Sequence, residues 1–319
     1  MRMIGESLVF IGAEPSPLAL LPAPNADLRL RSTYEPGPTT IHYTEGRDYR
    51  FDAATGSITS LPGSRLPDFR TNVLYGQEDF DHTAFPGYGN LPFFAYADYS
   101  TDAAINWPKP IANEKSLSAT RAKLSAGEPL RIVAYGDSIT YGGETSEPHL
   151  VFWQRWADKL QIKYPRATIQ IVNAATGGDC TTQGLERLDE KILSHQPDLV
   201  LVGFGMNDHN RDCVPLLRFK TQLAEIVTRI HEQTGAETLL FSTFPPNPKW
   251  RHGSHQMAAY AQTTAQVAAS TGSAFVDVYA AWSLFAARKR PEDMLANNIN
   301  HPNDFGHWIY YQALAELAV

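Results

Sequence analysis

From Leu130 to the C-terminus, short apolar runs alternate with longer segments of helical periodicity, and this alternation constrains the fold more than any other feature of the chain. Short apolar runs predict buried strands, and apolar positions at helical spacing predict amphipathic helices. The predicted strands are Arg131–Tyr135, Thr168–Asn173, Leu199–Phe204, Thr238–Ser242 and Ala274–Val278. The predicted helices are Pro148–Lys163, Thr181–His195, Pro215–Gln233, Ser254–Thr271 and Asp304–Leu317. Such alternation predicts a parallel sheet with helices on both faces.

The first 110 residues show a different pattern. More than half of the 22 prolines precede Leu130, and short alternating segments occur at 28–34 and 40–43. A hairpin is predicted from residues 48–52 and 57–61, which flank Thr55-Gly56. These features predict a β-rich accessory domain of sandwich or jelly-roll type over residues 1–112, a helical linker over 113–129 and a second domain over 130–319.

Residues 72–110 are rich in aromatic side chains, among them Tyr75, Phe80, Tyr96 and Tyr99. Two interpretations remain open for this segment. The aromatic rings form the core of a loop-rich β module or the seam between two domains, or they form a platform on which sugar rings stack.

Charge and hydropathy exclude several classes of protein. The net charge is −7 and Lys and Arg do not cluster, which argues against a nucleic-acid partner. No apolar run approaches the ~20 residues of a membrane span, and the N-terminal segment lacks the continuous apolar core of a signal peptide. We therefore expect a cytoplasmic protein with no membrane partner, and the sequence leaves open whether it is a homo-oligomer. The two cysteines, Cys180 and Cys213, are expected to be free thiols.

Polar residues that suit acyl transfer occur where one pocket is expected. Ser138 follows the first predicted strand and Gly178 lies in the glycine-rich turn after the second. Asn207 follows the third strand, and His301 precedes the last helix. Ligands of parallel sheets bind beyond the carboxyl ends of the strands. There, His301 can activate the Ser138 hydroxyl as a base. The Ser138 N–H, the Gly178 N–H and the Asn207 side chain can hold an oxyanion. Each of these residues alone could instead be a turn or capping residue.

In these residues the chain resembles the SGNH hydrolase superfamily, also called GDSL-type esterases and lipases. The matching blocks are Gly136-Asp137-Ser138-Ile139-Thr140, Asn173 with Gly178, Gly205-Met206-Asn207-Asp208 and His301 to His307. The resemblance implies a flavodoxin-like three-layer α/β/α domain with a five-stranded parallel sheet. It also implies Ser138 as nucleophile, His301 as base, and Ser138, Gly178 and Asn207 as the oxyanion hole. The order of the two domains is similar to carbohydrate esterase family 2.

One position departs from the family pattern. The family usually has an aspartate three residues before the catalytic histidine, where this chain has Asn298. A neutral amide is a poor substitute, because it stabilises an imidazolium weakly. Three explanations follow: a backbone carbonyl orients His301, another carboxylate such as Asp293 or Asp304 reaches it, or the site is impaired.

We therefore expect a serine esterase that removes short acyl groups, acetyl above all, from a carbohydrate without any cofactor. The alternatives are a catalytically impaired carbohydrate-binding protein and a lysophospholipase or lipase. Cys180 is interpreted as a packing or helix-start residue, and no metal site is expected at His252 and His255. The residues expected to contact substrate are Asp137, Asp208, His209, Trp250 and His255.

Overall fold

The computed structural model describes residues 1–112, 116–210 and 213–319, which form two compact units. The smaller unit comprises Met1–Asn106, Pro246–Arg251 and Leu284–Gly306, and the larger unit comprises Trp107–Pro245, His252–Ser283 and His307–Val319. The predicted domain boundaries stay a prediction. Residues 113–115 of the predicted linker lie outside the described residues. The rest of it contains helix α1 (Ser118–Ala126), which ends at Gly127 in the left-handed conformation, with φ of 77°.

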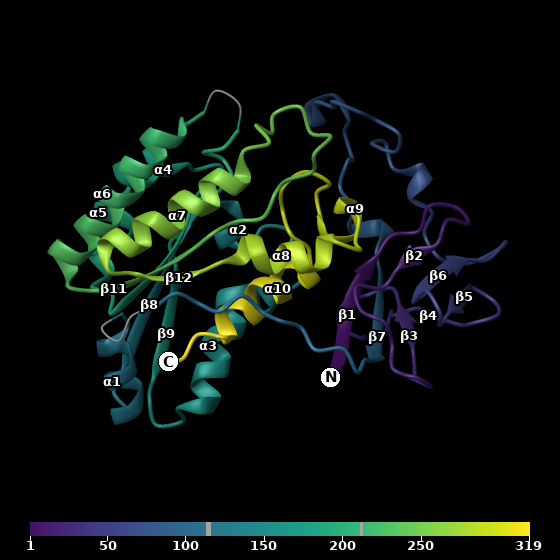
Figure 1. Cartoon of the computed structure of the whole chain (residues 1–319), viewed down its shortest axis with the longest axis horizontal. Helices are drawn as coiled ribbons and strands as arrows, with labels where there is room; N and C mark the ends of the chain where they lie inside the picture. The colour runs from purple at the N-terminus through teal and green to yellow at the C-terminus, as the bar shows by residue number, and fades with distance from the viewer. Residues whose placement is uncertain (113–115, 211–212) are drawn as a thin grey trace. The chain divides into compact units, whose positions relative to one another are not determined.

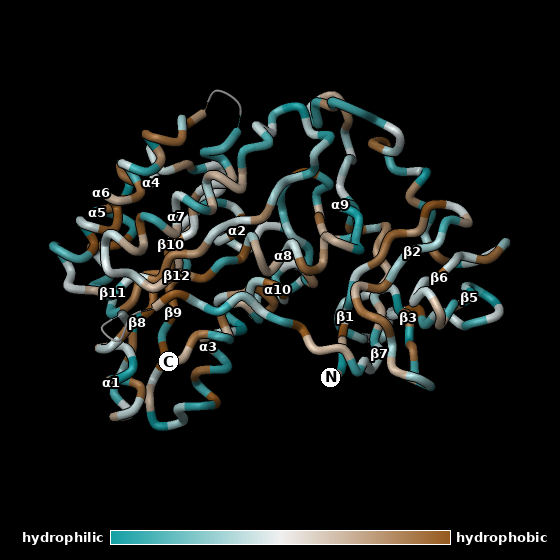
Figure 2. Tube along the Cα trace, in the orientation of Figure 1, coloured by the Kyte–Doolittle hydropathy of each residue, from teal (hydrophilic) through white to brown (hydrophobic). Residues whose placement is uncertain are grey.

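The larger unit is built on a five-stranded parallel sheet (Figure 1). Its strands are β8 (Leu130–Gly136), β9 (Ile169–Asn173), β10 (Leu199–Gly203), β11 (Glu237–Phe241) and β12 (Ala274–Val276). They lie in the order β12-β11-β10-β8-β9, and all adjacent pairs are parallel. All five residues of β10 are buried, as expected for a strand covered on both faces. Hydrophobic segments, brown in Figure 2, run through this sheet. The predicted five-stranded parallel sheet is confirmed.

Helices cover both faces of this sheet. The helix α3 that follows β8 lies on one face and helices α4–α7 lie on the other (Figure 1), as right-handed crossovers require when the chain reverses direction after β9. The α-helices after α1 are α2 (Ser138–Tyr141), α3 (Phe152–Lys163), α4 (Thr181–Glu186), α5 (Leu188–Lys191), α6 (Leu216–Thr234), α7 (Met257–Thr271), α8 (Val278–Ala286), α9 (Pro291–Met294) and α10 (Asp304–Ala315). The 3₁₀ helices are η1 (Phe69–Thr71), η2 (His82–Ala84), η3 (Leu91–Phe93), η4 (Pro148–Leu150) and η5 (Leu193–His195).

Several helical predictions differ from the structure. The helix predicted over Pro148–Lys163 is divided into η4 and α3. The single helix predicted over Thr181–His195 is divided into α4, α5 and η5. Its first turn, Thr-Thr-Gln-Gly, combines two β-branched residues with Gly184, which lowers the helix propensity. Helix α8 was missed, because its sequence VYAAWSLFA is nearly all apolar and shows little helical periodicity.

The smaller unit is β-rich, as predicted, and contains two antiparallel sheets. The first has the order β1-β7-β3-β4 and the second the order β2-β6-β5. The strands are β1 (Arg2–Leu8), β2 (Ser16–Pro17), β3 (Arg29–Arg31), β4 (His42–Tyr43), β5 (Tyr49–Asp52), β6 (Ser57–Ser60) and β7 (Ala95–Ser100). The predicted hairpin is confirmed by the pairing of β5 with β6, in which Tyr49 lies opposite Ser60.

A late segment of the chain, residues 284–306, belongs to the smaller unit and is tied to strand β1. The Lys289 ammonium donates to Glu6 at 2.9 Å, and both side chains are fully buried. The Asp293 carboxylate accepts a hydrogen bond from the Val9 N–H at 2.8 Å. This segment carries His301, so the position of the candidate base is set by the smaller unit.

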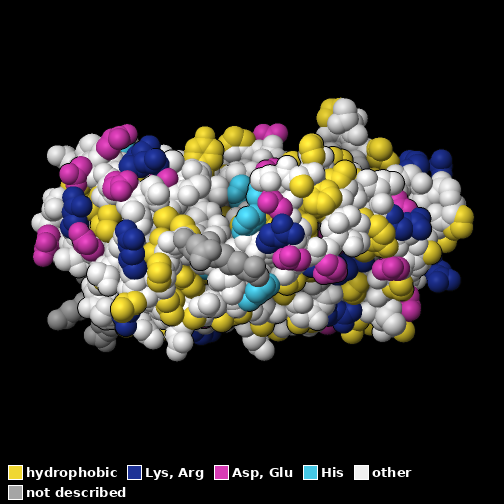
Figure 3. Space-filling view, turned by 90° about the horizontal axis from the view of Figure 1, so that it is seen from above, with side chains coloured by type: hydrophobic (Ala, Val, Ile, Leu, Met, Phe, Trp, Pro, Cys, Tyr) yellow, Lys and Arg dark blue, Asp and Glu magenta, His cyan; other side chains and the backbone are white. Residues whose placement is uncertain are grey.

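Surface charge and helix hydropathy bear on nucleic-acid and membrane binding. On the face seen in Figure 3, the described Lys and Arg side chains are interspersed with Asp and Glu. Among the described residues, no helix combines the length and the apolar character needed to cross a bilayer.

Candidate active site

Ser138 lies at the first residue of helix α2, directly after the carboxyl end of β8. The turn is tight, because a Cβ on Gly136 would lie 2.2 Å from the Gly203 carbonyl oxygen. Asp137 caps the helix, and its Oδ1 accepts a hydrogen bond from the Ile139 N–H at 2.9 Å. Strand, turn and helix place the half-buried Ser138 at the sheet edge. The sequence predicted this position for Ser138, but it did not predict the short helix α2 that begins there.

The glycine-rich turn after β9 lies beside Ser138. The Thr176 N–H donates to the Gly136 carbonyl at 3.0 Å, and a Cβ on Gly177 would lie 3.9 Å from the Ser138 Cβ. Gly178 has φ of 82°, a conformation that favours glycine, and a Cβ built on it would meet no atom within 4 Å. Among the described residues no acceptor takes the Gly178 N–H. This N–H is therefore available to an oxyanion.

Asn207 joins this turn from the end of β10. One N–H of its carboxamide donates to the Asp179 carbonyl at 2.9 Å, and no described residue accepts its second N–H. The structure thus brings three predicted residues of the oxyanion hole together within the larger unit: Ser138, Gly178 and Asn207.

Two acidic residues expected to contact substrate have other roles. Asp137 and Asp208 are 2% and 0% exposed. Asp208 accepts hydrogen bonds from the Thr181 N–H at 2.8 Å and from the Thr181 hydroxyl at 2.5 Å, so it holds the start of α4. Burial raises the pKa of Asp137 to about 7, with a smaller contribution from Asp208, and burial raises the pKa of Asp208 to about 6. Asp137 caps α2 and Asp208 is bonded to Thr181 at the start of α4, both inside the unit, which argues against the predicted substrate contacts.

The structure also argues against the predicted contact of His209 with substrate. Its side chain is fully buried, its Nδ1 donates to the Met206 carbonyl at 2.5 Å, and burial lowers its pKa to about 4. A neutral, buried imidazole held by its own loop is a packing residue and not a surface for substrate.

The two cysteines are free thiols, as predicted. Cys180 is the N-cap of α4, and its S–H donates to the Gln183 side chain at 2.8 Å. The Cys213 sulfur lies 3.6 Å from the Cys180 sulfur. Burial raises the pKa of Cys213 to about 12, and the hydrogen bond with Cys180 adds to the rise. These contacts agree with the helix-start role that the sequence suggested for Cys180.

The loop that carries His301 is built around Asn297 in the smaller unit. The Asn297 Oδ1 accepts the N–H groups of Ile299, Asn300 and His301 at 3.0, 2.9 and 2.9 Å. The His301 carbonyl accepts the Ala296 N–H at 2.9 Å. Asn297 therefore fixes the backbone on which the half-buried His301 stands. This role of Asn297 was not predicted from the sequence, although an Asn-rich run before a histidine is a recognisable signal of an Asx turn.

The side-chain amide of Asn298, in the usual aspartate position, makes hydrogen bonds within the smaller unit. Its Oδ1 accepts from Asn90 Nδ2 at 2.6 Å and its Nδ2 donates to the Tyr88 carbonyl at 3.1 Å. The side chain is 1% exposed and the backbone φ is 60°. Its predicted catalytic role is therefore replaced by a structural one. Both carboxylate oxygens of Asp293 are also engaged in hydrogen bonds. Its Oδ2 accepts from the Arg290 N–H at 2.9 Å, and its Oδ1 accepts from the Val9 N–H.

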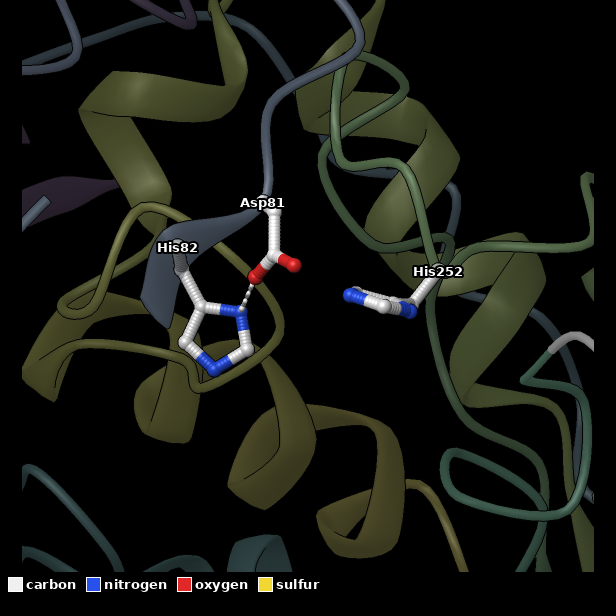
Figure 4. Close-up of side chains that lie close together, drawn as sticks. All are labelled: Asp81, His82 and His252. Carbon is white, nitrogen blue, oxygen red and sulfur yellow. Dashed lines mark ion pairs between the residues drawn. The ribbon is translucent and has the colours of Figure 1, made fainter. Parts of the chain in front are cut away.

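Trp250 occupies a core position that argues against the predicted contact with substrate. It is 5% exposed and packs with Leu74, Phe80 and Ile299 in the smaller unit. Its indole N–H donates to His82 Nδ1 at 3.1 Å, and His82 also lies 3.9 Å from the Asp81 carboxylate (Figure 4). His255 is exposed, with φ of 60°, so its substrate role stays a prediction.

Comparison with known proteins adds a family and several relatives. A model of the GDSL-like lipase/acylhydrolase family matches residues 134–309. An arylesterase of Vibrio mimicus is 26% identical over 117 residues, which cover 37% of this chain and 56% of that protein. An acetylxylan esterase of Geobacillus stearothermophilus is 27% identical over 168 residues, which cover 48% of this chain and 74% of that protein.

Among solved structures, a two-domain esterase active on acetylated mannans, crystallised with mannopentaose, superposes with a TM-score of 0.52 at 23% identity. The match covers 62% of this chain and 52% of that chain. The chain thus spans about half the length of this structural neighbour and of the Vibrio relative.

Proposed function

Because the chain belongs to the GDSL-like lipase/acylhydrolase family, we propose that it is a serine esterase that removes acetyl groups from an acetylated carbohydrate. The observation that carries this proposal is the position of Ser138 at the end of β8 beside the Gly177-Gly178 turn. A serine nucleophile needs oxyanion donors within reach of its hydroxyl, and this turn and Asn207 supply them.

The reaction proceeds through an acyl-enzyme. The Ser138 hydroxyl attacks the ester carbonyl carbon while His301 accepts its proton. The oxyanion of the tetrahedral intermediate accepts hydrogen bonds from the Ser138 N–H, the Gly178 N–H and Asn207 Nδ2. When the intermediate collapses, His301 returns the proton to the departing sugar oxygen. Water, activated by His301, then releases acetate and regenerates Ser138. No cofactor takes part.

Asn297 and Asn298 support this chemistry without touching the reacting atoms. Asn297 holds the backbone of His301, and Asn298 anchors the same loop through Asn90 and Tyr88. The loop is therefore preorganised by amide hydrogen bonds, which fix the geometry on which its function depends.

Support for the acyl group and its acceptor comes from the relatives. Two of them are named for acetyl esters of polysaccharides, an acetylxylan esterase and an esterase active on acetylated mannans. We propose the same substrate class, an acetylated carbohydrate, for this chain.

Hydrolysis of p-nitrophenyl acetate by the full chain tests the proposal. We expect Ser138→Ala and His301→Ala each to lower kcat/KM by about 10³-fold or more while far-UV circular dichroism stays unchanged. A series of acyl chain lengths should show a preference for acetyl. Full activity of Ser138→Ala would disprove the mechanism, and a preference for acyl chains of eight carbons or more would indicate a lipase instead.

A further inference from the structure

The smaller unit contains a cavity that the proposed reaction does not use. Its volume is about 460 Å³. We call it the Tyr75 cavity. The lining residues that bear on its chemistry are Phe69, Tyr75, Asn247, Lys249, Arg290 and Glu292. All of them belong to the smaller unit, and a volume of this size accommodates a small-molecule ligand.

Tyr75 presents a fixed aromatic ring at the mouth of this cavity. The Gln77 N–H donates to the Leu74 carbonyl at 3.1 Å, and Gly76 has φ of 74°, so residues 74–77 form a tight turn. The Phe69 ring packs edge-on against Tyr75, with centroids 6.4 Å apart and planes at 86°. Tyr75 is nevertheless 41% exposed, whereas Tyr96 and Tyr99 of the same aromatic segment are 5% and 1% exposed. Phe85, Tyr88, Phe93 and Trp107 of this segment are half-buried, so Tyr75 is its most exposed aromatic ring.

The polar groups of the cavity favour a ligand that donates hydrogen bonds. The Glu292 carboxylate is partly buried, burial raises its pKa, and within the described chain no other residue donates a hydrogen bond to it. Lys249 is already paired with Glu78 at 2.7 Å. Arg290, the second cation of the lining, is hydrogen-bonded to the Val9 carbonyl, the Ser16 hydroxyl and Asp293. An anionic ligand would therefore meet Glu292 while both cations are already engaged, and a cationic ligand would meet Lys249 and Arg290. An uncharged ligand with hydroxyl donors avoids both kinds of charge repulsion.

The far wall of the cavity continues into the loop of the candidate base. The Asn247 N–H donates to the Ile299 carbonyl at 2.7 Å, and Asn247 Nδ2 donates to the Asn298 carbonyl at 2.8 Å. A ligand in the cavity therefore lies against a residue that holds the loop of His301.

We propose that the Tyr75 cavity binds one uncharged sugar unit of the carbohydrate chain whose acetyl ester is hydrolysed. The apolar C–H face of the sugar stacks on Tyr75, and Glu292 accepts hydrogen bonds from its hydroxyl groups. This assignment rests on the proposed function for the identity of the chain, but binding at the cavity does not require turnover.

Variants at the cavity separate binding from chemistry. Tyr75→Ala and Glu292→Gln should each raise KM for acetylated xylo- or manno-oligosaccharides about tenfold and leave kcat/KM for p-nitrophenyl acetate within about twofold. Tyr75→Phe should keep the wild-type KM, because it retains the stacking surface. Ile41→Ala is the matched control, since Ile41 is also 41% exposed in the same unit.

A calorimetric titration with the corresponding unacetylated oligosaccharides provides a readout that is independent of esterase activity. We expect binding by wild type and Ser138→Ala, and at least tenfold weaker binding by Tyr75→Ala. If the wild type binds in this way but hydrolyses no ester, the cavity assignment stands and the proposed function fails. Equal affinities of wild type and Tyr75→Ala, or no binding at all, would overturn the cavity assignment.

Discussion

At Asn298 the backbone φ is 60° and both ends of the carboxamide are used, one by Asn90 and the other by the Tyr88 carbonyl. The Asn298 side chain, at the position where the family usually has an aspartate, is thus part of a buried network of amide hydrogen bonds. Because an amide can both donate and accept, it bridges a carboxamide and a carbonyl, which a carboxylate cannot do.

Asn298→Asp should not raise esterase activity, and it should lower the free energy of unfolding at pH 7.5 by about 1–3 kcal/mol. The new carboxylate faces the Tyr88 carbonyl without a proton to donate. Its folded-state pKa is therefore raised, so the lost stability returns as the pH falls toward the unfolded pKa of about 4. Urea unfolding at pH 5 and pH 7.5 together with kinetics measures both effects. Asn25→Asp is the control, because exposed Asn25 also has φ of 60°. A tenfold gain in activity would show instead that His301 lacks an orienting partner.

The raised pKa of Asp137 predicts that the free energy of unfolding depends on pH. Burial raises its pKa to about 7, so the folded state keeps a proton that the unfolded chain releases near pH 4. The stability that this proton contributes is fully present below about pH 4 and is lost as the pH rises through 7, with a total on the order of 2–4 kcal/mol. Asp137→Asn cannot titrate and should flatten this slope in urea unfolding between pH 4 and 7.5. Asp189→Asn, at a side chain that is 74% exposed, should leave the slope unchanged. The same slope in Asp137→Asn as in wild type would assign the pH dependence to other groups.

Among the secondary-structure elements, the ends of β8, β9 and β10 determine the candidate site. Parallel pairing places Tyr135 beside Val202 and Ala134 beside Asn173, so the three following loops emerge at one edge. Thr176 and Asn207 then join these loops through hydrogen bonds to Gly136 and Asp179. The oxyanion donors are therefore positioned by hydrogen bonds between these loops.

Gly178→Ala tests this arrangement against a matched glycine. Gly178 and Gly272 have φ of 82° and 74°, and a Cβ at either would meet no atom within 4 Å. Both substitutions to alanine should lower stability by a similar amount, about 1–2 kcal/mol, because the strain is that of the left-handed conformation. Only Gly178→Ala should also lower kcat for p-nitrophenyl acetate, by about tenfold or more, with a smaller change in KM. Equal kinetics of the two variants would remove Gly178 from the oxyanion hole.

At the level of the whole molecule, the chain returns to its N-terminal unit near its end. The buried pair of Lys289 and Glu6 connects residues 283 positions apart, and the Tyr99 hydroxyl donates to the second oxygen of Glu6 at 2.6 Å. The segment that carries His301 is therefore held by the fold of the smaller unit.

Lys289→Met should destabilise the protein by about 3–5 kcal/mol, because it leaves the Glu6 carboxylate buried without its cation. Lys109→Met removes a lysine that is 84% exposed and paired with Glu316, and it should change stability by less than about 1 kcal/mol. Urea unfolding curves of the two variants and wild type measure these changes in the free energy of unfolding. A small effect of Lys289→Met would show that water reaches Glu6 or that the segment detaches readily.

Much of this molecule follows from its sequence. The five strands and the order of the site blocks were predictable, since hydrophobic periodicity and residue type are local properties of the chain. Strand β7 and the buried tyrosines around it were not predicted as a strand, because aromatic residues mixed with Gly and Pro carry no clear period.

What only the tertiary structure decided is how each polar side chain is used. Asp137, Asp208, His209 and Trp250 were plausible substrate contacts by type and position, yet all four are buried. Burial and hydrogen-bond partners depend on residues distant in sequence, such as Asn90 for Asn298 and Glu6 for Lys289. The sequence alone therefore determined the fold of the larger unit and the residues eligible for chemistry. The packed structure decided which of them cap helices, which hold the His301 loop, and that Tyr75 stays 41% exposed.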